Sequence, residues 1–206
     1  MPGLYSWYYR VELADKDIVD CISGVKAGVS ESDRESMVRD FLEDRLFRYY
    51  REVPYAVTLS GKLKPKYQGK IDHAPDLSDS LIARLAQNPE ALHDIKRALK
   101  LAVPLFASPI YIGVAGRLRQ RLLQHVALIE YFLNLQASTL DLDPTAGTTT
   151  EEDASDHKFA YEVSMVRGFR ASNLVVNTLE LPVEDRVRFD LENILNRINY
   201  PLCGRN

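Results

Sequence analysis

The spacing of apolar and polar residues predicts a mixture of strands and helices. Residues 3–11 are mostly aromatic or apolar and good β-formers, so they are predicted to form a strand. Two further strands are expected over residues 109–113 and 174–181. Between them, one long helix that packs on the sheet is predicted from an apolar stripe at helical spacing: Leu118, Leu122, Val126, Ile129 and Phe132.

The segment after this long helix has a different character. Residues 141–156 are rich in Thr, Asp and Glu and lack apolar periodicity, which predicts a mobile acidic loop. A helix is expected over residues 159–169. Pro182 and Glu184 mark the start of a final helix that runs to Ile198.

Residues 12–104 do not belong to a compact core of this kind and are interpreted as an insertion. Ser30 followed by Asp33 indicates a helix start, and two strands joined by a basic turn are expected within residues 55–71. Helices are predicted over residues 78–86 and 89–103, the second stopped by Pro104. The predicted fold class is therefore α+β. A small three-stranded sheet flanked by helices (1–11 and 105–206) is interrupted by a large, mostly helical insertion with a hairpin (12–104).

Bulk properties narrow the class of protein. The chain has 206 residues and a formal net charge of −3, which argues against an indiscriminate nucleic-acid coat protein but leaves a DNA enzyme open. It contains no apolar run long enough for a membrane span, and its first residues do not resemble a signal peptide. Cys21 and Cys203 have no metal-ligand spacing, so free thiols in a reducing cytoplasm are expected.

Two short strings carry the chemical prediction. Gly3-Leu4-Tyr5 lies near the N-terminus, and Tyr111-Ile112-Gly113 ends the second strand. Arg121 and His125 follow Tyr111 by ten and fourteen residues and share one face of the next helix. This order resembles the GIY-YIG nuclease superfamily, most closely its stand-alone type II restriction endonuclease branch. The resemblance covers residues 3–10 and about 105–206.

The resemblance implies metal-dependent cleavage of DNA phosphodiesters and assigns a role to each residue. Tyr5 is the candidate general base, and nearby cations must lower its pKa from about 10. His125 accepts the proton from Tyr5 or orients it, and Tyr111 orients water or phosphate. Arg121 donates two hydrogen bonds to phosphate oxygens. Glu192 on the last helix holds one Mg²⁺, for which Mn²⁺ can substitute.

The chain departs from the family pattern at two places. Many relatives have a lysine directly after the second motif, where this chain has Val114. Many also have an asparagine about twelve residues after the glutamate, where this chain has Gly204. Asn206 is the expected substitute at the site, and Asn199 is the weaker choice.

Nucleic-acid contacts are expected from basic side chains and one aromatic residue on the hairpin and at the start of the long helix: Lys62, Lys64, Lys66, Tyr67, Lys70 and Arg117. Lysines on a hairpin tip also serve solubility and edge protection alone, and this alternative stays open.

Two functions remain open. The first is a DNA endonuclease in restriction or phage defence, for which a homodimer would suit cleavage of both strands. The second is a nucleic-acid-binding or regulatory protein that keeps the fold but has lost cleavage. Taken singly, each motif residue has an ordinary structural explanation. The functional interpretation rests on their order and spacing together.

Overall fold

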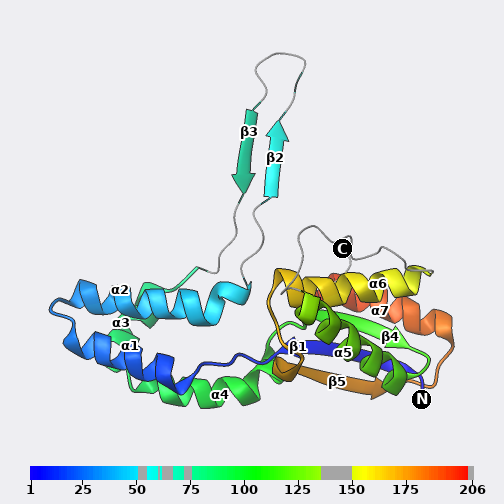
Figure 1. Cartoon of the computed structure of the whole chain (residues 1–206), viewed down its shortest axis with the longest axis horizontal. Helices are drawn as coiled ribbons and strands as arrows, with labels where there is room; N and C mark the ends of the chain where they lie inside the picture. The colour runs from blue at the N-terminus through cyan, green and yellow to red at the C-terminus, as the bar shows by residue number, and fades with distance from the viewer. Residues whose placement is uncertain (51–54, 60, 62–66, 72–75, 136–149, 204–206) are drawn as a thin grey trace. The chain divides into compact units, whose positions relative to one another are not determined.

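The chain divides into two compact units, drawn in Figure 1 from a computed structural model. The sheet unit comprises Met1–Glu12 and Arg97–Asn206, and the helical unit comprises Leu13–Lys96. The structure describes residues 1–50, 55–59, 61, 67–71, 76–135 and 150–203. Predictions that fall on other residues lie outside this description.

The sheet unit is built on a three-stranded antiparallel sheet with the order β4-β1-β5. Its strands are β1 (Gly3–Tyr9), β4 (Tyr111–Ala115) and β5 (Leu174–Glu180). Because side chains alternate along a strand, Tyr5, Trp7 and Tyr9 of β1 enter the core while their neighbours are half-buried. The first strand of the chain is thus the central strand.

Three helices pack around this sheet: α5 (Leu118–Leu135), α6 (Glu151–Tyr161) and α7 (Asp185–Asn199). α5 contacts β1, β4 and α6, whereas α7 packs on β4 and β1 (Figure 1). A π-helical turn, η3 (Glu162–Val166), and a 3-10 turn, η4 (Ala171–Asn173), lead from α6 to β5. The predicted α+β class with a three-stranded sheet is confirmed.

Among its described residues, the helical unit has four helices and a hairpin: α1 (Asp15–Ala27), α2 (Glu31–Phe41), α3 (Asp79–Gln87), α4 (Ala91–Phe106), β2 (Tyr55–Leu59) and β3 (Tyr67–Ile71). α2 continues into a π-helical turn, η1 (Leu42–Phe47), and a 3-10 turn, η2 (Arg48–Tyr50), and α4 extends into the sheet unit. The helix start predicted at Ser30 is a capping box. The Ser30 hydroxyl accepts from the Asp33 N–H at 3.0 Å, and the Asp33 carboxylate accepts from the Ser30 N–H at 3.1 Å.

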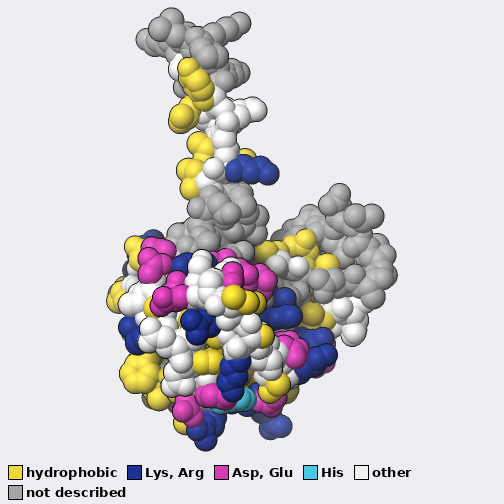
Figure 2. All heavy atoms as spheres, turned by 90° about the vertical axis from the view of Figure 1, so that its left-hand side faces the viewer, with side chains coloured by type: hydrophobic (Ala, Val, Ile, Leu, Met, Phe, Trp, Pro, Cys, Tyr) yellow, Lys and Arg dark blue, Asp and Glu magenta, His cyan; other side chains and the backbone are white. Residues whose placement is uncertain are grey.

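Basic and acidic side chains are interspersed on the face of the helical unit that Figure 2 presents. Such a surface generates no strong field of one sign. This face therefore offers little to attract a phosphate backbone.

Two local predictions are wrong. Pro104 does not stop its helix, because α4 runs to Phe106 and the Ala107 N–H still bonds to the Val103 carbonyl at 3.0 Å. A proline in the last turn forfeits one backbone bond without ending the helix. The acidic segment predicted as a loop is helical from Glu151 onwards, while its earlier part lies outside the described residues.

Within the part of the chain that the structure describes, no helix has the length and apolar character needed to cross a membrane.

Candidate active site

The candidate site begins where β1 pairs with β4. Tyr5 lies opposite Gly113 in the strand register, and its ring lies over the glycine. A Cβ atom on Gly113 would come within 2.6 Å of the Tyr5 hydroxyl oxygen and 2.8 Å of the Tyr111 ring. The centroids of the two tyrosine rings are 6.1 Å apart. The glycine of the second motif therefore makes room for the tyrosine of the first.

α5 supplies Arg121 and His125 from one helix face. His125 is fully buried, and its Nε2 atom lies 3.5 Å from the Tyr5 hydroxyl. The imidazole packs edge-on against the two motif tyrosines, stacks on Trp7 at 6.2 Å between centroids, and contacts Phe159 at 4.9 Å. An aromatic enclosure thus fixes the position of the histidine.

Asp156 on α6 completes the cluster, although the sequence interpretation assigned it to an acidic loop. Its Oδ1 atom lies 2.6 Å from a terminal nitrogen of Arg121 and 2.9 Å from Nε2 of His125. Both Asp156 and His125 are completely buried, and the Arg121 side chain is only 11% exposed. The carboxylate therefore ties the predicted arginine to the predicted histidine.

A signal for Asp156 exists in the sequence. Phe159, Ala160 and Val163 follow it at offsets of three, four and seven residues, and all four side chains are buried. This is the spacing of one buried helix face. An aspartate within such a face requires a cationic or hydrogen-bonding partner, because an isolated buried carboxylate is costly.

The protonation of the tyrosines is set mainly by burial. Burial raises the pKa of Tyr5 far above its ordinary value, neighbouring Tyr111 raises it further, and a hydrogen bond from Arg121 only partly opposes this. Burial also raises the pKa of Tyr111, followed by the charge of Glu192. The cation beside Tyr5 is present as expected, but the predicted lowering of the pKa does not result.

Glu192 lies on α7, the helix that packs on β4 and β1. It is half-buried, and its charge acts on Tyr111. Among the described residues no group of three or more His, Cys, Asp or Glu side chains is placed to hold a metal ion. A single carboxylate near Tyr111 nevertheless fits Mg²⁺, which keeps several waters and binds through one or two carboxylates together with substrate phosphates.

The remaining predicted site residues lie apart from this cluster or outside the described chain. Asn206 and three hairpin lysines, Lys62, Lys64 and Lys66, lie outside the described residues. Asn199 is half-buried, and its amide donates to the Leu195 carbonyl. Val114, the position at which the family resemblance leads one to expect a lysine, is buried in β4.

The predicted nucleic-acid contacts that are described are all exposed. Arg117 precedes α5, and Tyr67 and Lys70 lie on β3. Because strand side chains alternate, Tyr67 and Lys70 point to opposite faces of the hairpin. One nucleotide therefore cannot stack on the tyrosine and contact this lysine from the same side.

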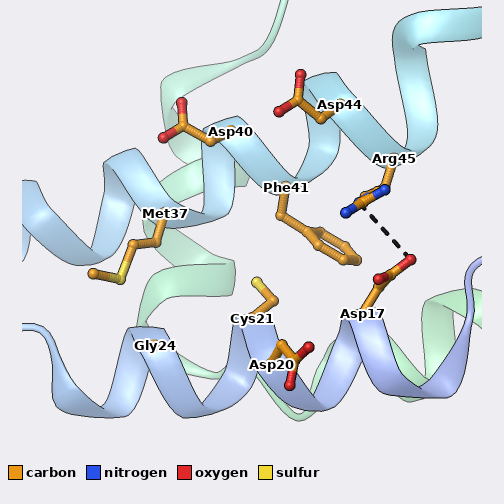
Figure 3. Close-up of a pocket in the computed structure, with 9 residues that line it drawn as sticks. All are labelled: Asp17, Asp20, Cys21, Gly24, Met37, Asp40, Phe41, Asp44 and Arg45. Atoms are coloured by element: carbon orange, nitrogen blue, oxygen red, sulfur yellow. Dashed lines mark ion pairs between the residues drawn. The ribbon is translucent and has the colours of Figure 1, made fainter.

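A surface pocket of about 410 Å³ lies between α1 and α2 in the helical unit (Figure 3). Cys21 and Phe41 point into the space between the helices, and Asp17 pairs with Arg45 at 3.8 Å. Three more aspartates line it: Asp20, Asp40 and Asp44. Burial raises the pKa of the Cys21 thiol to about 11, so the thiol stays protonated at neutral pH. The pocket's charge does not suit a phosphate.

Comparisons with protein-family models, with curated proteins and with solved structures found no match for this chain.

Proposed function

We propose that the chain is a Mg²⁺-dependent endonuclease that hydrolyses phosphodiester bonds in DNA, of the GIY-YIG type, acting in restriction or phage defence. The observation that supports this most is the convergence of Tyr5, Arg121 and His125 from β1 and α5, with Tyr111 from β4 beside them. Tyr5 and His125 are 120 residues apart in the chain. The motif residues thus form one buried cluster around a hydrogen-bonded core.

Arg121 is the proposed phosphate ligand. Its planar guanidinium can donate paired hydrogen bonds to two phosphate oxygens, which a lysine ammonium cannot match. Asp156 holds the guanidinium from one side at 2.6 Å, and Arg121 also donates to the Tyr5 hydroxyl. These contacts fix the orientation of the fork, which lowers the entropic cost of holding a phosphate.

His125 is the proposed general base. An ionised Asp156 only accepts hydrogen bonds, so Nε2 of His125 is assigned the proton that it donates to Oδ1. The ring's lone pair then lies on Nδ1, which is buried without a hydrogen-bond partner among the described residues, so water reaches it only when the closed site opens. A base oriented by a carboxylate is a recurrent arrangement in hydrolytic enzymes.

In the proposed reaction, Nδ1 of His125 takes a proton as the water oxygen bonds to phosphorus. The P–O bond to the leaving oxygen breaks, and that oxygen is protonated by solvent. Tyr5 stays neutral because burial raises its pKa. Its hydroxyl accepts a hydrogen bond from Arg121 and so positions the guanidinium. Mg²⁺ held by Glu192 would neutralise charge that develops on the phosphate and the leaving oxygen.

A second function is favoured by the closure of the site. Tyr5 is 1% exposed, and the charge of Arg121 is already paired with Asp156. A chain that keeps this arrangement when it meets nucleic acid would bind without cleaving. It would then be a catalytically lapsed nucleic-acid-binding or regulatory protein.

Incubation of the purified protein with supercoiled plasmid separates the two functions. The nuclease produces nicked and linear DNA with Mg²⁺ or Mn²⁺ and none with EDTA. A lapsed protein retards the plasmid on a gel in every buffer and leaves it supercoiled. Cleavage of an RNA of matched sequence, with the plasmid left intact, would identify RNA rather than DNA as the substrate.

A further inference from the structure

α7 exposes the apolar side chains that an amphipathic helix normally buries. Val187, Ile194 and Ile198 are 50%, 54% and 66% exposed, and Leu191 between them is half-buried. Their successive spacings of four, three and four residues place all four on one side of the helix. We refer to Val187, Leu191, Ile194 and Ile198 as the α7 stripe.

A different face holds α7 in the sheet unit. Arg188 is the most buried side chain of the helix, and its guanidinium bonds to the carbonyls of Leu181 and Val183 and to the Asp185 carboxylate. Glu192 and Leu195, on the same side as Arg188, are half-buried. The helix is therefore anchored by a polar contact at its start, and the α7 stripe lies beside the packed face.

We propose that the α7 stripe is the contact between two copies of this chain, which pair through α7 in antiparallel orientation. A spacing of four, three and four residues is that of the apolar seam where two helices pack side by side. Because each copy presents the same seam, a twofold axis across it buries both at once. This closed, self-complementary arrangement is the commonest form of protein oligomer.

The charges beside the α7 stripe select the second copy and the antiparallel orientation. Asp190 and Arg197 are both exposed, stand seven residues apart and flank the same edge of the stripe. With the twofold axis at the centre of the stripe, between Glu192 and Asn193, Asp190 of each copy lies two residues, roughly 3 Å along the helix, from the level of Arg197 of the other. A parallel pair would place Asp190 opposite Leu195 and gain no ion pair.

The size of the α7 stripe predicts a weak dimer. Its eleven-residue separation from Val187 to Ile198 corresponds to roughly 17 Å of helix. Such a seam buries less than the ~800 Å² per partner of a standard stable interface. Association with Kd on the order of 10 μM is therefore expected. The inference does not depend on the proposed nuclease activity.

Sedimentation velocity of the full chain between about 1 and 200 μM tests the pairing, since this range brackets the expected Kd. The wild type should shift from monomer to dimer across this range. Asp190→Arg and Arg197→Asp each place two like-charged contacts in the dimer and should raise Kd at least about tenfold. The doubly swapped Asp190→Arg/Arg197→Asp chain should dimerise like the wild type.

The two single variants also provide an internal rescue. Mixed in equal amounts, they can form a heterodimer in which both contacts join opposite charges, so association should return. Ile194→Lys should abolish dimerisation because its two copies lie next to the axis, whereas Glu130→Arg on α5 should leave it unchanged. A wild type that is monomeric at every concentration would overturn the proposal. So would a dimer that ignores all these substitutions, or single variants that fail to pair when mixed.

Discussion

Gly113 shows how the absence of one side chain shapes the candidate site. A Cβ there would lie 2.6 Å from the Tyr5 hydroxyl oxygen and 2.7 Å from its Cζ atom. Gly113→Ala should therefore destabilise the fold by about 1–3 kcal/mol, as overpacked cores do. Gly116→Ala, where the new methyl meets nothing within 4 Å, is the matched control. Urea unfolding measures both, and equal midpoints would contradict the close approach of Tyr5.

Asp156 is the residue that the motif alone does not reveal. Asp156→Asn leaves the Arg121 charge nearly buried without its counter-ion and should cost about 3–5 kcal/mol of unfolding free energy. Arg121→Met in the same chain removes that stranded charge, so the double variant should be more stable than the two single losses added together. Urea titration of all four proteins completes the cycle. Additive losses would show that the two side chains are not coupled.

The proposed roles of Tyr5 and His125 can be separated by substitution, because burial raises the pKa of the Tyr5 hydroxyl. A tyrosine whose pKa is raised stays neutral at pH 7 and cannot take a proton as tyrosinate. His125→Ala should therefore lower the single-turnover cleavage rate by about 10²–10⁴. Tyr5→Phe should cost less than about tenfold and leave the pH profile unchanged. The opposite result, a dead Tyr5→Phe with a nearly normal His125→Ala, would restore the tyrosine as base.

At the scale of elements, segments with strong local signals were predicted well. The Ser30 cap and the two strands of the hairpin needed only nearby residues. α1 was not predicted, although Ile18, Ile22 and Val25 lie at helical spacing. The start of α6 was missed because its first two turns are acidic and contain no large apolar residue. Its buried face begins at Asp156, whose partners come from another helix.

The capping box of α2 gives a prediction for pH. Hydrogen bonds from the Ser30 hydroxyl and N–H groups at the helix start lower the pKa of Asp33. Because the folded-state pKa is lowered, the carboxylate adds stability at pH values above its unfolded-state pKa of about 3.9. This stability is lost as the pH falls through the folded-state pKa. Asp33→Asn should thus lower the Tm at pH 7, with the difference from wild type shrinking as the pH falls below about 3.9 and through the folded pKa.

Thermal unfolding followed by circular dichroism at several pH values measures this difference. Glu35→Gln, on the same helix but beyond the cap, should show a smaller change. A gap between Asp33→Asn and the wild type that does not shrink as the pH falls would rule out the carboxylate as its source.

At the scale of the molecule, the sequence predicted the fold class and the order of the sheet unit's elements because both follow from local patterns. The proximity of Tyr5, Tyr111, Arg121 and His125 was expected from the family resemblance alone. What could not be predicted is electrostatic. The buried face of α6 signals that Asp156 needs a partner, but that this partner is Arg121, and that Tyr5 is buried, depend on which elements pack together.

The central claim is that this cluster, with Glu192, performs metal-dependent cleavage. The most direct test compares wild type, Glu192→Gln and the control Glu180→Gln for plasmid cleavage in Mg²⁺ and for DNA binding in Ca²⁺. Glu192→Gln should bind like the wild type but retain less than about one hundredth of its cleavage rate, a loss of roughly 2.7 kcal/mol of transition-state stabilisation, while Glu180→Gln should cleave normally. Binding without cleavage by the wild type, or full cleavage by Glu192→Gln, would contradict it.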